Sequence, residues 1–542
     1  MPVHPVPGES QSAPEAALVL RAATADITPE AGRPLGGYAA RGDRGAVGRH
    51  DPLLATLICL GIGSDAVAWL TLDAVAVDAG LAGELRAGVG RALEIPAEHV
   101  LVCASHTHSG PSGWTGALHP SDAEEREGDL VAGLVDAVGA LAVAAASAAE
   151  PVEAQWCLAA TPGVAANRQG PEGPHDDRTG VLALRAPGSG AVRALLYDHA
   201  GHPTVLGPEN MLWSADWPGA VRAVLGGALV AAAGFAEAAV GGGLAGFGEA
   251  AGGGPAGFGE AAADAAPSAF ADSAGGAGQG AGAGPAGGAG PAAGARPAAG
   301  AGQGTGPGPF AGAGQAAGPG PFALAPARPP VIGFLQGPAG DASPRLLRRG
   351  RDFAEVARFG AVLAGPVLRA LHDEARPLPP DAVARVLRDT VELPVRPRPT
   401  RDDAARDLAA AEAAWRPHAD APQTPEARIA ATRLDGARRQ VRLVEAELPE
   451  SLALPISVVT FAGLAWVHLP VELTGGLAER ILAAGPADAT RVVGYSDGYF
   501  GYLPDAAAHR HGTYEALSSL FTPDSGERLV AAASALLAKA AS

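Results

Sequence analysis

Two histidines separated by a single residue could begin a metal site. His106 and His108 occur in the sequence ASHTHSGP, directly after the apolar run HVLVCA at residues 99–104. If the backbone is extended there, both imidazoles point to the same side, and imidazole is the commonest protein ligand for metals. The Ser-Gly-Pro that follows predicts a turn, which places the pair at a strand end, where functional residues gather. Two surface histidines would give the same pattern, so residues elsewhere must decide.

Four further segments present a reactive side chain after an apolar run, and the residues concerned are His202, Ser343, Glu472 and Tyr502. We expect these strand ends to converge on one cleft. Histidines together with a carboxylate form a catalytic zinc site that leaves one coordination position for water. Nitrogen ligands beside a carboxylate and a phenolate favour zinc over other divalent ions. The pattern therefore predicts a zinc site, although fourteen histidines also allow chance pairings.

Each of these residues also fits a structural role. Glu472 would be favourable at the start of the helix expected at 473–484, because a carboxylate complements the helix dipole there. Ser343 suits a turn or a helix cap, and the tyrosines near the C-terminus could be core or rim aromatics. We expect His468, which lies in an apolar strand, to be a core histidine.

The charge of the chain excludes two classes of partner. Its 542 residues carry a formal net charge of −18 and its pI is about 5.2, whereas nucleic acids and anionic lipid surfaces require a basic face. The three cysteines lie in apolar segments without metal-ligand spacing, and we expect them to be buried thiols. Neither a secretory signal nor a transmembrane run is recognised, so we expect a cytoplasmic protein.

Apolar strands alternate with amphipathic helices along most of the chain. This alternation predicts an α/β fold of mixed β-sheets flanked by helices. The expected strands lie at 18–23, 54–61, 66–72, 99–104, 152–159, 180–185, 192–197, 330–336, 454–461, 464–469 and 491–495. The expected helices lie at 78–93, 123–147, 216–225, 353–374, 401–446 (one or two helices), 473–484 and the C-terminus.

The chain is expected to form a single catalytic domain that a long insertion interrupts. We predict a disordered tail at 1–17, the two parts of the catalytic domain at 18–225 and 329–542, and a flexible low-complexity insertion at 226–328. The insertion consists mainly of Gly, Ala and Pro, and AGFGEAA occurs in it twice. Such a segment cannot bury enough apolar surface to offset its chain entropy. A role as a partner-binding arm stays an alternative.

The segments that carry reactive residues resemble the neutral/alkaline ceramidase family. The resemblance covers residues 20–225 and 330–525. Its segments follow the family's order: ADITP (25–29), PLGGY (34–38), GRHDPLLAT (48–56), ASHTHSGPSG (104–113), ANR (166–168), GHPT (201–204), SADWPG (214–219), GDASP (340–344), PVELT (470–474), GYFGYLPD (498–505) and TYEALSS (513–519). Because 28 residues follow Tyr514, we expect only the catalytic domain, without the C-terminal immunoglobulin-like domain of secreted members.

The resemblance implies a function and a role for eight residues. Members of the family are zinc amidases that cleave the N-acyl bond of ceramide. The implied zinc ligands are His106, His202, Glu472 and Tyr502. The implied catalytic residues are His108 as the catalytic histidine, Arg168 and Tyr514 near the scissile carbonyl, and Ser343 as the serine once proposed as a nucleophile.

The resulting hypothesis is a zinc-dependent hydrolase of an N-acyl amide, either N-acylsphingosine or a related small molecule, lipid or otherwise. We predict attack by a metal-activated water without an acyl-enzyme, with His108 protonating the departing nitrogen and Arg168 and Tyr514 stabilising the oxyanion. Two alternatives stay open: a zinc esterase or other acyl hydrolase, and a catalytically silent scaffold with 226–328 as its interaction arm. Neither the exact substrate nor the oligomeric state follows from the sequence.

Overall fold

Three β-sheets and the helices on their outer faces make up the part of the chain that a computed structural model describes. The described residues are 17–42, 44–115, 126–170, 172–241, 328–420, 424–486 and 488–541. They belong to one folded unit. The predicted α/β fold with mixed sheets is confirmed.

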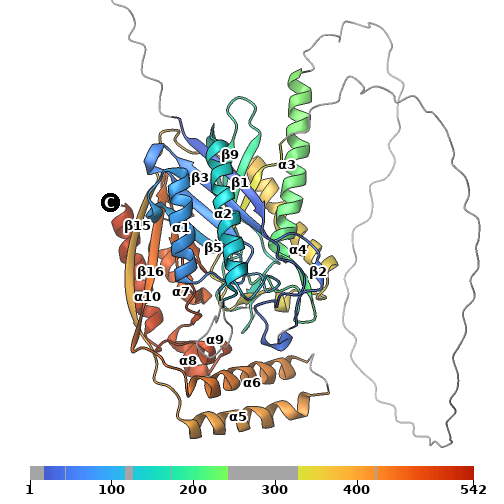
Figure 1. The fold of residues 1–542 in the computed structure, drawn as a ribbon, viewed down its shortest axis with the longest axis vertical. Helices are drawn as coiled ribbons and strands as arrows, with labels where there is room; N and C mark the ends of the chain where they lie inside the picture. Colours follow the sequence, from blue (N-terminus) through green and yellow to red (C-terminus); the bar gives the residue numbers. More distant parts are fainter. Residues whose placement is uncertain are drawn as a thin grey trace, which may run out of the picture. The chain divides into compact units, whose positions relative to one another are not determined.

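The first sheet has the strand order β5-β4-β3-β1-β6. Its strands are β1 (Val19–Asp26), β3 (Leu54–Gly61), β4 (Val67–Leu72), β5 (Val100–Ala104) and β6 (Glu150–Pro151). Helices α1 (Ala79–Leu93) and α2 (Gly128–Ser147) pack on one face, as the blue and cyan helices of Figure 1 show. Because β4 and β5 are parallel, both end at the same edge, where β5 delivers the segment that contains His106.

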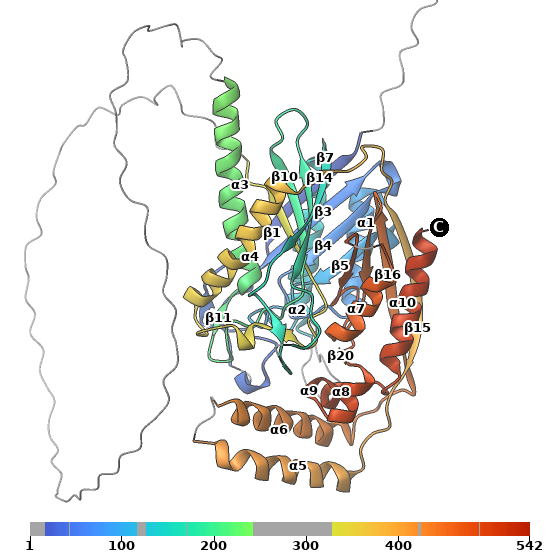
Figure 2. The same cartoon turned by 180° about the vertical axis from the view of Figure 1, so that it is seen from behind.

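The second sheet has the strand order β12-β10-β9-β7-β14. Its strands are β7 (Glu153–Ala160), β9 (Arg178–Arg185), β10 (Val192–His199), β12 (Val331–Gln336) and β14 (Arg376–Pro377). Helices α3 (Trp217–Gly241) and α4 (Phe353–Asp373) cover its outer face (Figure 2). Side chains such as Trp69 and Trp156 fill the space between the first two sheets. Strands β3, β4, β5 and β12 are covered on both faces and are accordingly almost continuously apolar.

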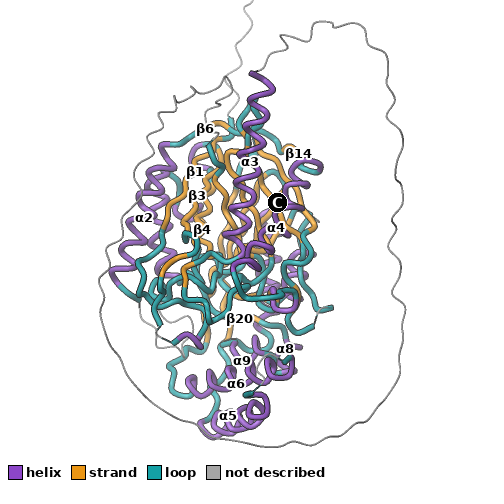
Figure 3. The backbone as a smooth tube through the Cα atoms, turned by 90° about the vertical axis from the view of Figure 1, so that its right-hand side faces the viewer, coloured by secondary structure: helices purple, strands orange, loops and turns teal. Residues whose placement is uncertain are grey.

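The third sheet has the strand order β15-β16-β17-β19. Its strands are β15 (Arg385–Pro394), β16 (Ser451–Phe461), β17 (Leu464–His468) and β19 (Thr490–Val493), with α7 (Gly475–Ala483) and α10 (Ser525–Ala541) packed against it. Helices α5 (Arg401–Trp415) and α6 (Pro425–Leu443) are inserted between β15 and β16. Helix α6 packs against α9 (Tyr514–Ser518), near α8 (Ala506–His511), and α5 lies on the other side of α6 (Figure 3).

The described residues also form three short strand pairs: β2 (Gly48–Arg49) with β11 (Leu212–Trp213), β8 (Ala166–Asn167) with β13 (Ala342–Ser343), and β18 (Glu472–Leu473) with β20 (Tyr502–Leu503). The second and third pairs contain candidate residues. The second pair places the segment before Arg168 beside the GDASP segment. The third pair places Glu472 directly opposite Tyr502.

Two of the longer elements differ from the prediction, and the short helices α8 and α9 are absent from it. Helix α3 continues to Gly241, past the end predicted near Leu225, because its alanine-rich continuation has high helix propensity. Strand β15 is missing from the prediction, because it is a largely exposed edge strand whose charged and apolar residues alternate irregularly. Residues 226–241 of the predicted insertion at 226–328 are therefore helical, and 242–327 lie outside the described residues. The predicted tail at 1–17 lies outside them too, apart from residue 17.

Within the described ranges, two helices are long and apolar enough to cross a membrane, judged by length and composition alone. They are Gly128–Ser147 and Trp217–Gly234. In this structure Leu134 and Val138 of the first belong to the core beside the first sheet. Val221 of the second belongs to the core beside the second sheet. Because core helices of folded proteins meet the same criteria, they support no transmembrane assignment.

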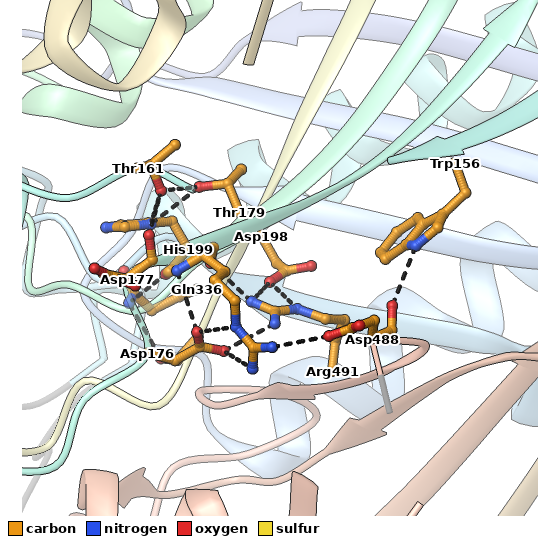
Figure 4. Close-up of polar contacts among 12 residues, drawn as sticks. Trp156, Thr161, Asp176, Asp177, Thr179, Asp198, His199, Gln336, Asp488 and Arg491 are labelled. Carbon is orange, nitrogen blue, oxygen red and sulfur yellow. Dashed lines mark hydrogen bonds and ion pairs between the residues drawn. The ribbon is translucent and has the colours of Figure 1, made fainter. Parts of the chain in front are cut away.

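A buried polar cluster joins the second and third sheets. Nε of Arg491, in β19, donates to Asp198 of β10 at 2.7 Å, and Nη1 pairs with Asp176 at 2.8 Å. Figure 4 shows the guanidinium between these two carboxylates, with His199 and Thr179 beside them. Nδ1 of His199 lies 3.1 Å from the Thr179 hydroxyl. A buried guanidinium is stable only when it is paired, so the cluster fixes how β10 lies against β19.

We expect the protein to lose stability as the pH falls below about 6.5. Burial lowers the pKa of His199 and of His468 to about 3, from an ordinary value of 6.5. Between these values the unfolded chain binds protons that the folded chain does not. The free energy of unfolding should therefore fall by up to about 1.4 kcal/mol per pH unit for each imidazole.

Urea denaturation at several pH values measures this slope. Replacing His468 by glutamine should flatten it, whereas His372→Gln, at a side chain that is 89% exposed, should leave it unchanged. An equal slope in wild type and His468→Gln would show that burial of His468 does not contribute to acid sensitivity.

Candidate active site

His106 and His108 lie in the turn that follows β5. The backbone at His106 is left-handed, with a φ of 64°, and not extended as the sequence analysis assumes, because its amide donates to Ala74 O at 2.8 Å. Nδ1 of the His106 ring lies 2.6 Å from Val75 O. A carbonyl only accepts, so Nδ1 carries the proton and Nε2 presents a lone pair. The two rings still meet, with centroids 4.8 Å apart.

His202 follows β10 of the second sheet and is buried. Its amide donates to Ala342 O at 3.0 Å, and Nδ1 of its ring lies 3.2 Å from the same oxygen. This contact again leaves Nε2 as the free nitrogen. The ligand-type nitrogens of His106, His108 and His202 all lie within 4.8 Å of one another. Three predicted site residues are thus brought together from two sheets.

Glu472 follows β17 of the third sheet, and its side chain is 2% exposed. Its Oε2 lies 3.5 Å from Nε2 of His106 and 3.1 Å from Nε2 of His202. Nε2 of His202 makes no aligned hydrogen bond to any described residue. Each of the three sheets therefore delivers one side chain to the same buried point.

Burial and neighbouring groups set the protonation states of this group. Burial lowers the pKa of His108, and the imidazoles of His106 and His202 lower it further. Burial also lowers the pKa of His202. Burial opposes ionisation of Glu472, but the two imidazoles hold the pKa of that carboxyl well below its usual value. The lowered pKa values of His108 and His202 favour neutral rings, and a neutral imidazole beside an ionised carboxylate is the state in which both can bind a metal cation.

The donor set is compatible with a metal site. Nε2 lone pairs of His106 and His202 face a carboxylate oxygen, and Nε2 of His108 lies 3.3 Å from that of His106. Acceptors that face one another in a buried space repel unless a proton or a cation lies between them. In metal sites, the histidine nitrogen that does not bind the metal commonly donates to a backbone carbonyl. Nδ1 of His106 and of His202 lies on a carbonyl oxygen in this way.

Two tyrosines that are not among the predicted site residues, Tyr495 and Tyr499, contact the same carboxylate. The Tyr495 hydroxyl donates to Oε2 of Glu472 at 3.3 Å, and the Tyr499 hydroxyl donates to Oε1. The sequence contains one indication that these tyrosines belong to the site. The chain has six tyrosines, and three of them fall within residues 495–502.

The predicted ligand Tyr502 lies among the predicted catalytic groups. Its ring centre is 5.6 Å from that of Tyr514. The guanidinium carbon of Arg168 lies 5.5 Å from the Tyr502 ring and 5.4 Å from the Tyr514 ring. Arg168 Nε donates to Glu515 at 2.7 Å, a partner that sequence reasoning missed. The structure thus brings Arg168, Tyr502 and Tyr514 together, and the pairing of β18 with β20 sets them beside Glu472.

Ser343 acts as a cap in this structure. Its Oγ accepts from the Arg345 amide at 3.3 Å at the start of a short 3₁₀ turn. The neighbouring Asp341 accepts from Asn167 Nδ2 at 2.9 Å and from the Gly475 amide at 2.8 Å. Because Ala342 O contacts His202, the GDASP segment positions that histidine.

The PLGGY segment packs against His108. The Tyr38 ring meets the His108 ring edge-on, with centroids 4.8 Å apart. Buried Arg41 donates to His108 O and, at 2.9 Å, to Gly36 O. A Cβ atom on Gly37 would lie 2.5 Å from the His108 ring, and the φ of Gly37 is 87°. Glycine therefore allows the loop to approach the imidazole closely.

Solved structures of ceramidases match this arrangement of elements. One is a neutral ceramidase from Pseudomonas aeruginosa, with a TM-score of 0.62 at 14% sequence identity over 96% of this chain and 74% of that chain. Another is a ceramidase complexed with C2, with a TM-score of 0.62 at 14% identity over 97% of this chain and 75% of that chain. The chain has a neutral ceramidase-like fold. No family model matches the chain, and no curated protein matches its sequence.

The ceramidase-like fold confirms the fold that the sequence resemblance implies. At 14% identity, the likeness concerns the fold alone. The roles of the eight site residues therefore stay predictions, which the geometry around His106, His202 and Glu472 makes testable.

We expect Gly37→Ala to displace the His108 ring, because the added Cβ would overlap it. Gly32→Ala is a matched control: Gly32 also has a positive φ, of 101°, but nothing lies within 4 Å of its Cβ position. Both variants should lose about 1–2 kcal/mol of stability from the backbone strain. Only Gly37→Ala should shift the NMR signals of the His108 imidazole. Identical imidazole spectra for the two variants would contradict the close packing.

Proposed function

We propose that this protein is a zinc-dependent hydrolase that cleaves the amide bond of an N-acyl compound, with lipid amides as the preferred class. The observation that carries the proposal is the convergence of His106, His202 and Glu472, from three sheets, on one buried point. The ceramidase-like fold supports it, because two of the solved structures that share this fold are ceramidases.

The residues that would hold zinc are Nε2 of His106 and His202, Oε2 of Glu472 and the hydroxyl of Tyr502. Bound zinc supplies a Lewis acid for the amide carbonyl and a water whose pKa is lowered to about 7. Nε2 of His202, which is buried without an aligned hydrogen bond to a described residue, and two imidazoles held from behind by carbonyls support this assignment.

His108 would transfer the proton. Burial lowers the pKa of its imidazole, so the ring is neutral near pH 7 and can accept a proton from the attacking water. It can then donate that proton to the departing nitrogen, which is a poor leaving group until it is protonated. The contacts of Tyr38 and Gly37 with the ring would keep it oriented for both steps.

Arg168 and Tyr514 would stabilise the negative charge on the amide oxygen. Arg168 is held by Glu515 and by Gly340 O, at 2.7 Å each, so its guanidinium is fixed before substrate binds. Preorganised donors of this kind contribute strongly to acyl transfer, because they need no reorganisation during the reaction. Ser343 is proposed to shape the loop, with water attacking the carbonyl directly.

The first test measures bound metal by elemental analysis of purified protein. We expect about one zinc per chain in wild type, and loss of it in His106→Ala and Glu472→Ala. His372→Ala, at an exposed histidine, should keep the metal. A well-folded wild type that neither contains zinc nor takes it up would refute the proposal.

The second test measures turnover of chromogenic N-acyl amides and the matching esters. Arg168→Lys keeps the charge beside Glu515 but loses the guanidinium fork, and we expect kcat to fall about 10²–10³-fold. Ser343→Ala should retain most activity, because only a cap is lost.

Hydrolysis of esters without amides would support the esterase alternative, and hydrolysis of neither would favour a silent scaffold. An acyl adduct on Ser343 in trapping experiments would rule out direct attack by water.

A further inference from the structure

Tyrosine is scarce in this chain but concentrated around the histidine group. Of the six tyrosines, Tyr197 lies in the core against Phe334. The others contact candidate site residues, and they are Tyr38, Tyr495, Tyr499, Tyr502 and Tyr514. The resemblance assigns Tyr502 and Tyr514, so Tyr495 and Tyr499 remain to be explained.

Both oxygens of the Glu472 carboxylate accept a hydrogen bond from a phenol. Tyr499 donates to Oε1, and Tyr495 donates to Oε2 at 3.3 Å. A carboxylate only accepts, so both hydroxyls act as donors to it.

The same two rings pack against His106. The Tyr495 ring centre lies 4.1 Å from that of His106, at an interplanar angle of 30°. The Tyr499 ring lies 6.4 Å from both His106 and Tyr495, at 26° and 18°. The two tyrosines thus touch both the carboxylate and one of the imidazoles that face it.

The backbone at Tyr495 is strained, and three sheets hold it in place. Its φ is 53°, a conformation that bulky side chains rarely adopt. Around it, the amides of Gly494, Ser496 and Asp497 donate to Gln336 O at 2.9 Å, Leu469 O at 3.1 Å and Val102 O at 2.8 Å. These acceptors belong to, or directly follow, strands of the second, third and first sheets. Backbone strain of this kind persists only where the surrounding structure maintains it, and it is common at functional sites. Here it fixes the orientation of the Tyr495 side chain.

We propose that Tyr495 and Tyr499 form a phenol clamp that holds the Glu472 carboxylate in the orientation required to bind a divalent metal together with His106 and His202. The inference rests on the proposed metal site and adds two positioning residues to it. Hydrogen bonds to a ligating carboxylate fix which oxygen faces the metal, and losing such an outer contact typically lowers metal affinity about 10–100-fold. The clamp acts through Glu472 and needs no contact with substrate.

The test compares zinc affinity in Tyr495→Phe, Tyr499→Phe and the double variant. Phenylalanine keeps the ring and its packing on His106 and removes only the hydroxyl. Tyr197→Phe is the control, because it removes another buried hydroxyl, which donates to Pro218 O at 3.4 Å. Zinc Kd is measured by chelator competition, and the coordination of the metal is followed by the visible absorption of the cobalt-substituted protein. Thermal denaturation shows that each variant is folded.

We expect each clamp variant to bind zinc about 10–100-fold more weakly than wild type and to alter the cobalt spectrum, while Tyr197→Phe behaves as wild type. Unchanged Kd values and spectra in all the folded variants would overturn the clamp and leave the proposed function intact. A wild type that binds no zinc would overturn both. Because metal affinity is measured without substrate, an absence of amidase activity does not affect the result.

Discussion

A buried carboxylate that faces two imidazoles is the constraint on which the rest of this structure depends. Glu472 follows β17, His106 follows β5 and His202 follows β10, so each group comes from a different sheet. An ionised carboxylate removed from water is stable only when its partners are in place. The three sheets must therefore dock in one relative position, and the buried tryptophans and leucines between them fill the remaining space.

Polar links between the sheets make that docking specific, since apolar packing alone tolerates sliding. Arg491 joins β19 to β10 through Asp198, and Arg388 of β15 pairs at 2.7 Å with Asp497, whose side chain also accepts from Val102 of β5 at 3.0 Å. These buried pairs lose their partners if a sheet shifts. The turn that carries Tyr495 lies where all three sheets meet, which explains why a strained backbone persists there.

The groups proposed to act on substrate are supported differently from those proposed to bind metal. The histidines and Glu472 follow strands of the main sheets, whereas Tyr514 and Glu515 belong to the short helix α9. That helix is held by α6, where Gln440 donates to Leu517 O at 2.6 Å and the guanidinium of Arg439 lies 6.0 Å from the Tyr514 ring. Changes in the inserted pair α5–α6 would therefore reach Tyr514 and Glu515 before they reach His106, His202 and Glu472.

The sequence by itself determined most of the elements and the residue types that meet at the candidate site. Continuous apolar runs identified most strands of the buried sheets, and HTH, GHPT and PVELT identified the three side chains that meet. It could not identify β15, whose pattern reflects an exposed edge, or the helical continuation of α3 past Leu225. Only the tertiary structure decided that Tyr495 contacts Glu472, that Glu515 holds Arg168 and that His106 is left-handed. Each of these depends on contacts between residues far apart in the chain, and local sequence carries no information about which distant partner a side chain will meet.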